Sequence, residues 1–331
     1  TIPQIQGGGE RSPYEGQVVT TRGVVTRINS NGYFLQDPVG DGDASTSDGV
    51  FVFTGGAPTA PVAVGNELRV TGTVTEFAVG SGAEAVARPV TELTNTSATL
   101  LGAGPALAPL VITLPEVNDG ELARYEGMLV RIASPLTASQ NFFQGRYGQV
   151  TLAAGGRLEK PTNRHPAGSP EALALADDNA RRRILLDDGS SAQNPDPTPY
   201  IGDDNTLRAG DTLPDGITGV IDYGLANNFS DGLSDYRIHP TAPVDFVRSN
   251  ERPANAPVVG GNVRVGSFNV LNYFSTIDQT GASCFPGGTR SDCRGADSAA
   301  ELERQRNKIV PAINGLGADV VGLIEIENNG N

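Results

Sequence analysis

The sequence has 331 residues, of which 38% are hydrophobic, 42 are glycine and 23 are proline. This composition supports packed cores and excludes collagen-like, membrane-spanning and wholly disordered chains. The formal net charge is −14 and the pI is about 4.6, so the field of the whole molecule repels polyanions. A chain of this length is expected to form two or three domains, and no segment suggests a particular protein partner.

Two short sequence landmarks occur twice in the same order. The tripeptide Tyr-Glu-Gly at 14–16 recurs at 125–127, and each copy precedes a strand-like run. The dipeptide Thr-Gly at 71–72 recurs at 218–219. This repetition predicts a tandem duplication, with equivalent strands that begin near Val18 and Leu129.

Each copy consists of short β-branched and aromatic runs between glycine, asparagine and proline turns. In the first copy, strands are expected at 17–28, 33–36, 50–53, 68–77 and 90–93. Five short strands favour a small Greek-key barrel of the oligonucleotide/oligosaccharide-binding (OB) type. The predicted domains are an OB-like barrel over 1–95 and a duplicate with insertions over 109–247, one of them a helix at 170–180. The segments 96–108 and 248–261 are expected to be linkers.

The pattern changes after residue 261. A strand at 263–270, a helix that begins after Ser298 and ends at Gly317, and a strand at 318–326 predict a βαβ unit with a parallel strand pair. Pro311 is expected to kink or restart the helix. Because chemistry gathers at the carboxyl ends of parallel strands, Asn269 and Glu325 are the candidate site residues.

Several motifs in this sequence carry a family resemblance. The segments Ser-Phe-Asn-Val-Leu-Asn-Tyr-Phe at 267–274, Arg-Gly-Ala at 294–296, Arg-Gln-Arg-Asn-Lys-Ile-Val at 304–310 and Ala-Asp-Val-Val-Gly-Leu-Ile-Glu-Ile-Glu-Asn-Asn at 318–329 resemble the ExeM/NucH-type extracellular endonucleases. That family belongs to the DNase-I-like endonuclease/exonuclease/phosphatase superfamily. The segments at 34–38 and 41–52 are similar to the OB-like region that precedes its nuclease domain. The resemblance therefore implies a mainly β protein, with two tandem OB-like barrels followed by the first βαβ portion, 262–331, of a DNase-I-like α/β sandwich.

The resemblance also implies a function. Asn269 matches the superfamily's first active-site asparagine and Glu325 its metal-binding glutamate, with Glu327 as a competing candidate for that role. Such a site uses Mg²⁺ or Mn²⁺ to hydrolyse phosphodiester bonds of DNA or RNA, and the family is secreted. Its remaining Asp, Asn and His residues would lie beyond Asn331, so the 331-residue chain alone is expected to be inactive. The alternative is a non-catalytic extracellular or cell-surface binding module that keeps a nuclease-like remnant.

Four acidic residues near the N-terminus form a second candidate metal site. Asp37, Asp41, Asp43 and Asp48 lie within twelve residues, but Thr46 and Val52 replace residues that an EF-hand requires. The cluster is either an irregular structural Ca²⁺ loop or a plain acidic turn.

The remaining candidates have both structural and functional interpretations. Cys284 and Cys293 are the only cysteines, nine positions apart in a turn-rich segment, and are expected to form a disulfide. Phe51 and Phe53 could stack on nucleic-acid bases or lie in the barrel core. The other residues weighed are expected to be structural: the two histidines at turns or strand ends, and the arginine run in local ion pairs. They are His165, His239 and 181–183.

Overall fold

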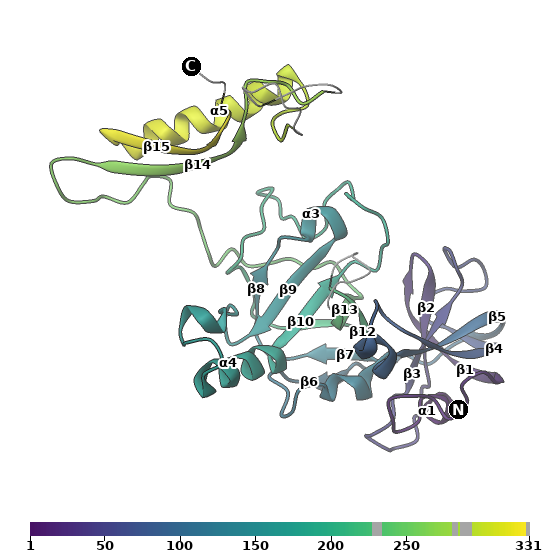
Figure 1. Cartoon of the computed structure of the whole chain (residues 1–331). Helices are drawn as coiled ribbons and strands as arrows, with labels where there is room; N and C mark the ends of the chain where they lie inside the picture. Colours follow the sequence, from purple (N-terminus) through teal and green to yellow (C-terminus); the bar gives the residue numbers. More distant parts are fainter. Residues whose placement is uncertain (227–233, 280–283, 285–292, 329–331) are drawn as a thin grey trace. The chain divides into compact units, whose positions relative to one another are not determined.

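The structure is a computed structural model that describes residues 1–226, 234–279, 284 and 293–328. The chain is mainly β and divides into two compact units, 1–250 and 251–331. The first unit contains two β regions (Figure 1), and the second contains one strand pair with a helix. No helix among the described residues is long and apolar enough to cross a membrane.

The first β region is a closed five-stranded barrel with strand order β1-β2-β3-β5-β4. All neighbouring strands are antiparallel except β3 and β5, which are parallel. The short α1 contributes Ile2 and Ile5 to the barrel core, which is otherwise formed by inward-facing residues such as Leu35, Leu68 and Leu93. The elements are α1 (Ile2–Gln6), β1 (Val18–Asn29), β2 (Gly32–Gln36), β3 (Gly49–Phe53), β4 (Asn66–Phe77), α2 (Ala83–Ala87) and β5 (Val90–Ala103).

The second β region is an eight-stranded sheet with the order β11-β8-β9-β10-β13-β12-β7-β6. Its helical elements include α4, which begins at the expected proline and is capped by Ser169. The elements are β6 (Leu110–Ile112), η1 (Glu121–Tyr125), β7 (Leu129–Ile132), β8 (Leu136–Gln140), α3 (Gln144–Tyr147), β9 (Gln149–Ala154), η2 (Pro161–Asn163), α4 (Pro170–Arg181), β10 (Arg183–Asp187), β11 (Thr212–Leu213), β12 (Ile217–Leu225) and β13 (Ser234–Pro240).

This sheet differs from the expected second closed five-stranded barrel. The counterpart of the long strand β1 is divided into β7 and β8 by residues 133–135, and β6 and β11 are added at the sheet edges. Pro135 has no N–H to donate to a neighbouring strand. The N–H of Ala133 instead donates to the carbonyl of Ile112 on β6, and the hydroxyl of Ser134 donates to the carbonyl of Leu114, which follows β6.

The strand pairing nevertheless repeats that of the barrel. In the barrel, the first half of β1 pairs with β4 and the second half with β2. In the second sheet, β7 pairs with β12 and β8 pairs with β9. The antiparallel pairs β2–β3 and β4–β5 and the parallel pair β3–β5 correspond to β9–β10, β12–β13 and β10–β13.

The register agrees at the level of single residues. Gly16 and Gly127, the glycines of the repeated tripeptide, both have φ of 78°. The N–H of Gly16 donates to Val74 on β4, and the N–H of Gly127 donates to Ile221 on β12. The glycines of the repeated Thr-Gly dipeptide pair with equivalent valines, Val19 with Gly72 and Val130 with Gly219.

The barrel and the second sheet contact each other within the first unit. The Arg27 guanidinium donates to the carbonyls of Pro240 (2.6 Å) and Asp188 (2.8 Å). The Gln36 side chain accepts from the N–H of Leu129 at 2.8 Å. At Gly49 and Gly127 the two backbones approach so closely that a Cβ on either glycine would lie within 2.6 Å of the other strand's backbone.

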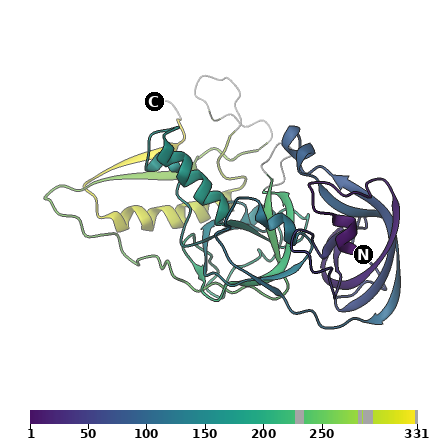
Figure 2. The ribbon, with the colours of Figure 1, turned by 90° about the horizontal axis from the view of Figure 1, so that it is seen from below.

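The second unit is the expected βαβ arrangement. Strands β14 (Val265–Tyr273) and β15 (Val320–Ile326) are parallel, and α5 (Ala299–Leu316) connects them and lies along one face of the pair (Figure 2). The Ser298 hydroxyl accepts from the N–H of Glu301, and Gly317 ends the helix in a left-handed conformation.

Two sequence predictions are wrong in detail. The segment 96–108 is not mainly a linker, because β5 continues to Ala103 and pairs with β4 through most of that length. The helix does not restart at Pro311, because α5 is continuous from Ala299 to Leu316.

Candidate functional site

Asn269 and Glu325, the two residues predicted as an active-site pair, lie side by side on β14 and β15. The parallel register aligns Asn269 with Ile324, the neighbour of Glu325. The Asn269 Nδ2 donates to Glu325 Oε1 at 2.8 Å, and Asn269 Oδ1 accepts from the N–H of Leu271 at 2.8 Å. The amide is therefore held at both ends, and it orients the carboxylate without adding charge.

The backbone at this point is unusual for a strand. Glu325 has φ of 65°, and Leu271 and Asn272 on the facing strand have φ of 51° and 54°. The pairing of the two strands shifts between Asn269 and Tyr273. A left-handed conformation at a non-glycine residue costs about 1–3 kcal/mol, and such strain concentrates at functional sites. Both site side chains are exposed.

The nearby Glu327 has a different role. Its carboxylate accepts four hydrogen bonds, from the N–H and the hydroxyl of both Ser275 and Thr276, at 2.5–3.0 Å. These donors outweigh the effect of burial and lower the pKa of Glu327. Glu327 thus fastens the segment after β14 to the end of β15, whereas Glu325 has one recorded side-chain partner.

The chemistry of this pair fits one part of a divalent-cation site. Mg²⁺ and Mn²⁺ favour carboxylate oxygens, and the exposed Glu325 offers one such ligand. Within the residues that the structure describes, no three His, Cys, Asp or Glu side chains are grouped to hold a metal. Asn269 and Glu325 can therefore supply one ligand and its orientation, but not a complete coordination shell.

The acidic cluster near the N-terminus forms local turns. Asp37 accepts from the N–H groups of Val39 and Gly40, and Asp41 and Asp43 accept from donors two to five residues ahead. Asp48 is half-buried, and both burial and the charges of Asp41 and Asp37 raise its pKa. Among the described residues, these carboxylates do not form a group of three that could hold a metal ion, and their recorded hydrogen bonds are those of local turns.

Other sequence predictions have clear outcomes. Cys284 and Cys293 form a disulfide, as expected. The arginines at 181–183 are engaged in ion pairs with Asp177, Asp178 and Asp235. Phe51 and Phe53 do not lie in the barrel core: Phe51 is half-buried and Phe53 is 37% exposed.

Both phenylalanines line a cavity of about 830 Å³ in the first unit. The barrel contributes Phe51 and Phe53 from β3, Phe77 from β4 and Glu92 from β5. The second sheet contributes polar side chains from four adjacent strands, namely Gln149 (β9), Asp187 (β10), Asp222 (β12), and Arg237 and His239 (β13). The cavity is thus formed where the barrel meets the sheet.

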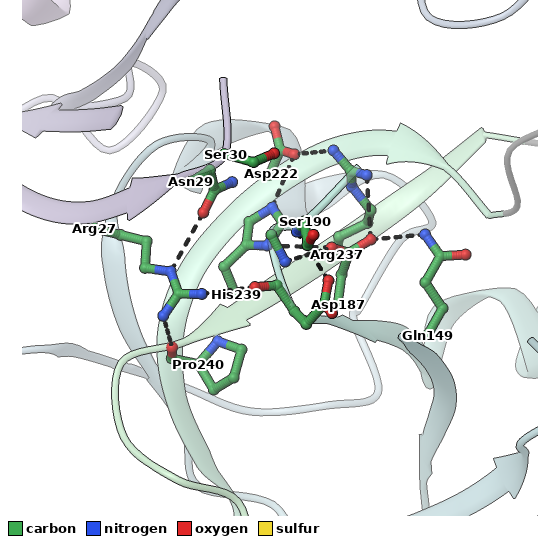
Figure 3. A network of polar contacts seen from close by, with 12 residues as sticks. Arg27, Asn29, Ser30, Gln149, Asp187, Ser190, Asp222, Arg237, His239 and Pro240 are labelled. Atoms are coloured by element: carbon green, nitrogen blue, oxygen red, sulfur yellow. Dashed lines mark hydrogen bonds and ion pairs between the residues drawn. The ribbon is translucent and has the colours of Figure 1, made fainter. Parts of the chain in front are cut away.

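The polar side chains of the sheet form a network (Figure 3). Arg237 lies between two aspartates: Nη1 donates to Asp187 at 3.2 Å, and Nη2 donates to Asp222. His239 Nε2 lies 3.1 Å from Asp222, and its Nδ1 lies 3.6 Å from Asp187. Gln149 Nε2 donates to Asp187 at 2.6 Å. The charge of Arg237, together with the contacts to His239, outweighs burial and lowers the pKa of Asp222 to about 2 and that of Asp187 below its ordinary value.

Glu92 faces the same cavity but stands outside the network. It is 8% exposed, and the structure records no hydrogen bond or ion pair to its carboxyl group among the described residues. Burial, and then the charge of Asp222, raise the pKa of Glu92 to about 7. Two neighbouring carboxyl groups thus have pKa values displaced in opposite directions, a pattern that marks functional sites.

Sequence reasoning missed this cavity because the polar residues described above come from five separate strands. His239 lies near the end of β13, as the sequence predicts, but it is 1% exposed and faces two carboxylates. The usable signal was the presence of charged residues inside strand-like runs, such as Asp222 and Arg237, where apolar residues are expected.

No protein-family model matches the sequence, and neither the curated proteins nor the solved structures include a significant match. The two candidate sites are therefore argued from the geometry of this chain alone.

Proposed function

We propose that this chain is the N-terminal portion of a secreted, metal-dependent endonuclease that hydrolyses phosphodiester bonds of DNA. The observation that carries the proposal is the contact between Asn269 and Glu325, at 2.8 Å on adjacent parallel strands. The strained backbone of Glu325 supports it, because such strain persists where a side chain must be aimed.

The fold gives further support. The closed barrel has the strand order and the single parallel pair of an OB fold, and the second sheet repeats its pairings and the positions of its landmark glycines. We therefore assign the first unit as two tandem OB-like domains, the second with a divided first strand. The βαβ unit supplies the first part of a DNase-I-like α/β sandwich, and the disulfide is consistent with an oxidising, extracellular environment.

A bound Mg²⁺ or Mn²⁺ would polarise a phosphate oxygen and lower the pKa of the attacking water. The Glu325 carboxylate would supply one of its ligands. Asn269 holds that carboxylate in position, because its amide is fixed between Leu271 and Glu325. Glu327 stays outside the reaction and keeps the ends of both strands together through Ser275 and Thr276. The remaining metal ligands and the base that takes the proton have no counterparts among the residues described.

The test is nicking of supercoiled plasmid by the complete product of the gene with Mg²⁺ or Mn²⁺. Glu325→Gln, which keeps the size and removes the charge, is expected to lower the rate at least 100-fold. Asn269→Ala is expected to lower it 10–100-fold, as for other residues that orient a metal ligand. The matched control is Glu303→Gln, an exposed carboxylate on α5 that should leave the rate unchanged. Nicking that persists with a chelator, or that Glu325→Gln does not change, would contradict the proposal.

The alternative is a non-catalytic extracellular binding module, and the cavity of the first unit is the observation that favours it. In that case the complete protein would bind a ligand in the cavity and hydrolyse no phosphodiester. The nicking assay and the binding experiment described below therefore give independent answers.

A further inference from the structure

The charges around the cavity of the first unit do not balance. Three acidic residues line it, Glu92, Asp187 and Asp222, against Arg237 and His239. The Arg237 guanidinium is shared between the two aspartates, and His239 lies between the same two carboxylates. No cationic side chain among the lining residues is left for Glu92.

Two lining side chains offer acceptors that have no recorded donor, and two offer nitrogens without a hydrogen-bond partner; of these nitrogens, His239 Nδ1 lies 3.6 Å from the Asp187 carboxylate. Glu92, 92% removed from solvent, has no recorded donor, and Gln149 Oε1 is buried without a hydrogen-bond partner. The unpaired donor Arg237 Nε lies against the backbone, since a Cβ on Gly224 would be 2.4 Å from it. A buried carboxyl group is either protonated or compensated by a partner, and a positively charged donor in the cavity would hold the Glu92 carboxylate in its ionised form.

The opposite wall is apolar and aromatic. Phe51 and Phe53 from β3 and Phe77 from β4 face the cavity, and Phe51 packs against Phe34 with the ring centroids 5.0 Å apart. Aromatic faces attract ammonium and guanidinium groups and also cover the short alkyl chain that carries them. Phosphate groups, in contrast, would be repelled by the surplus carboxylate.

We propose that this cavity binds an organic cation, a guanidinium or primary ammonium group on a short alkyl chain, with Glu92 as its counter-ion and the β3 phenylalanines against its stem. This ligand class is distinct from the DNA substrate proposed for Asn269 and Glu325. The cation comes from a free amine such as agmatine or from an arginine or lysine side chain of a peptide. The cavity of about 830 Å³ has room for either.

The experiment is isothermal titration calorimetry of the whole chain with four probes. These are agmatine, a blocked Gly-Arg-Gly peptide, uncharged 1,5-pentanediol and thymidine 5′-monophosphate. We expect agmatine, the peptide or both to bind, and the probe that binds identifies the source of the cation. We expect no binding of 1,5-pentanediol or of thymidine 5′-monophosphate. Absence of binding by both cations, or binding of the nucleotide in the cavity, would overturn the proposal.

Variants make the assignment specific. Glu92→Gln is expected to weaken cation binding at least 10-fold, and Phe53→Ala, at the partly exposed edge, several-fold. Glu67→Gln is the matched control, since this residue lies on β4 of the same barrel but does not line the cavity. Circular dichroism checks that each variant is folded. Equal affinity in Glu92→Gln and in the wild type would refute the role of Glu92, whereas plasmid nicking tests Glu325 separately.

Discussion

The pair of repeated glycines provides a controlled test of how the barrel meets the second sheet. Gly16 and Gly127 have the same φ of 78°, and each donates its N–H to the equivalent strand, β4 or β12. Their surroundings differ. A Cβ on Gly16 would meet nothing within 4 Å, whereas a Cβ on Gly127 would lie 2.6 Å from the backbone of Gly49 and Val50.

The expected destabilisation follows from the left-handed backbone conformation and from the space around each Cβ. Alanine in a left-handed conformation costs roughly 1–2 kcal/mol, and this cost applies to Gly16→Ala and Gly127→Ala alike. Forcing a methyl group against backbone that cannot rotate away adds about 1–3 kcal/mol at Gly127 alone. We therefore expect a loss of about 1–2 kcal/mol for Gly16→Ala and about 2–5 kcal/mol for Gly127→Ala.

Urea unfolding followed by far-ultraviolet circular dichroism measures both variants against the wild type. Tyrosine fluorescence gives a second probe, because the chain has no tryptophan. We expect similar slopes of the unfolding free energy against urea concentration for both variants and a clearly lower midpoint for Gly127→Ala. Equal midpoints for the two variants would show that the barrel and the sheet do not meet at Gly49 and Gly127.

Three further predictions concern charge and covalent linkage. Because the pKa of Glu92 is raised to about 7 in the folded state, the unfolded state loses this proton first as pH rises, so stability falls between about pH 4.5 and 7. Glu92→Gln should therefore stabilise the protein by about 3 kcal/mol at pH 8 and have no effect at pH 4; equal effects at both pH values in urea titrations would contradict this. Asp222 has a pKa lowered to about 2, so its stabilisation is present above pH 4 and is lost as pH falls from about 4 to 2. Asp222→Asn should remove that acid transition and, by leaving Arg237 with a single carboxylate partner, lower stability at pH 7 by about 3–5 kcal/mol; an unchanged acid profile would refute the assignment. Replacing Cys284 and Cys293 by serine opens a loop with a sequence separation of nine and should cost the second unit about 2–3 kcal/mol in hydrogen-exchange measurements, and no change in exchange would argue against the bridge as a stabiliser.

Local sequence patterns predicted most of the elements because each depends on neighbouring residues. The alternation that begins at Val18 became β1, and the Ser298 cap and Gly317 became the ends of α5. Errors arose where tertiary contacts decide the structure. The segment after Thr96 contains small and polar residues, yet it extends β5 because β4 is long enough to pair with it. Pro311 is accommodated within the long α5.

The two candidate sites also differ in how far local sequence predicts them. Asn269 and Glu325 could be predicted, because a parallel pair places the ends of both strands at one edge. The isolated position of Glu92 could not be predicted, because the environment of Glu92 depends on Asp222, which lies 130 residues away in sequence and on another sheet. The division of β1's counterpart at Pro135 was likewise hidden, since the repeat landmarks lie on either side of it.

The central claim is that Glu325, oriented by Asn269, binds a divalent cation. The most direct measurement is titration of the complete product of the gene with Mn²⁺, monitored by paramagnetic broadening of the Asn269 side-chain amide signals in NMR spectra. The account predicts that these signals broaden first, that Glu325→Gln abolishes the effect and that Glu303→Gln preserves it. Broadening that is equally strong in Glu325→Gln, or that appears first at Glu303, would contradict it.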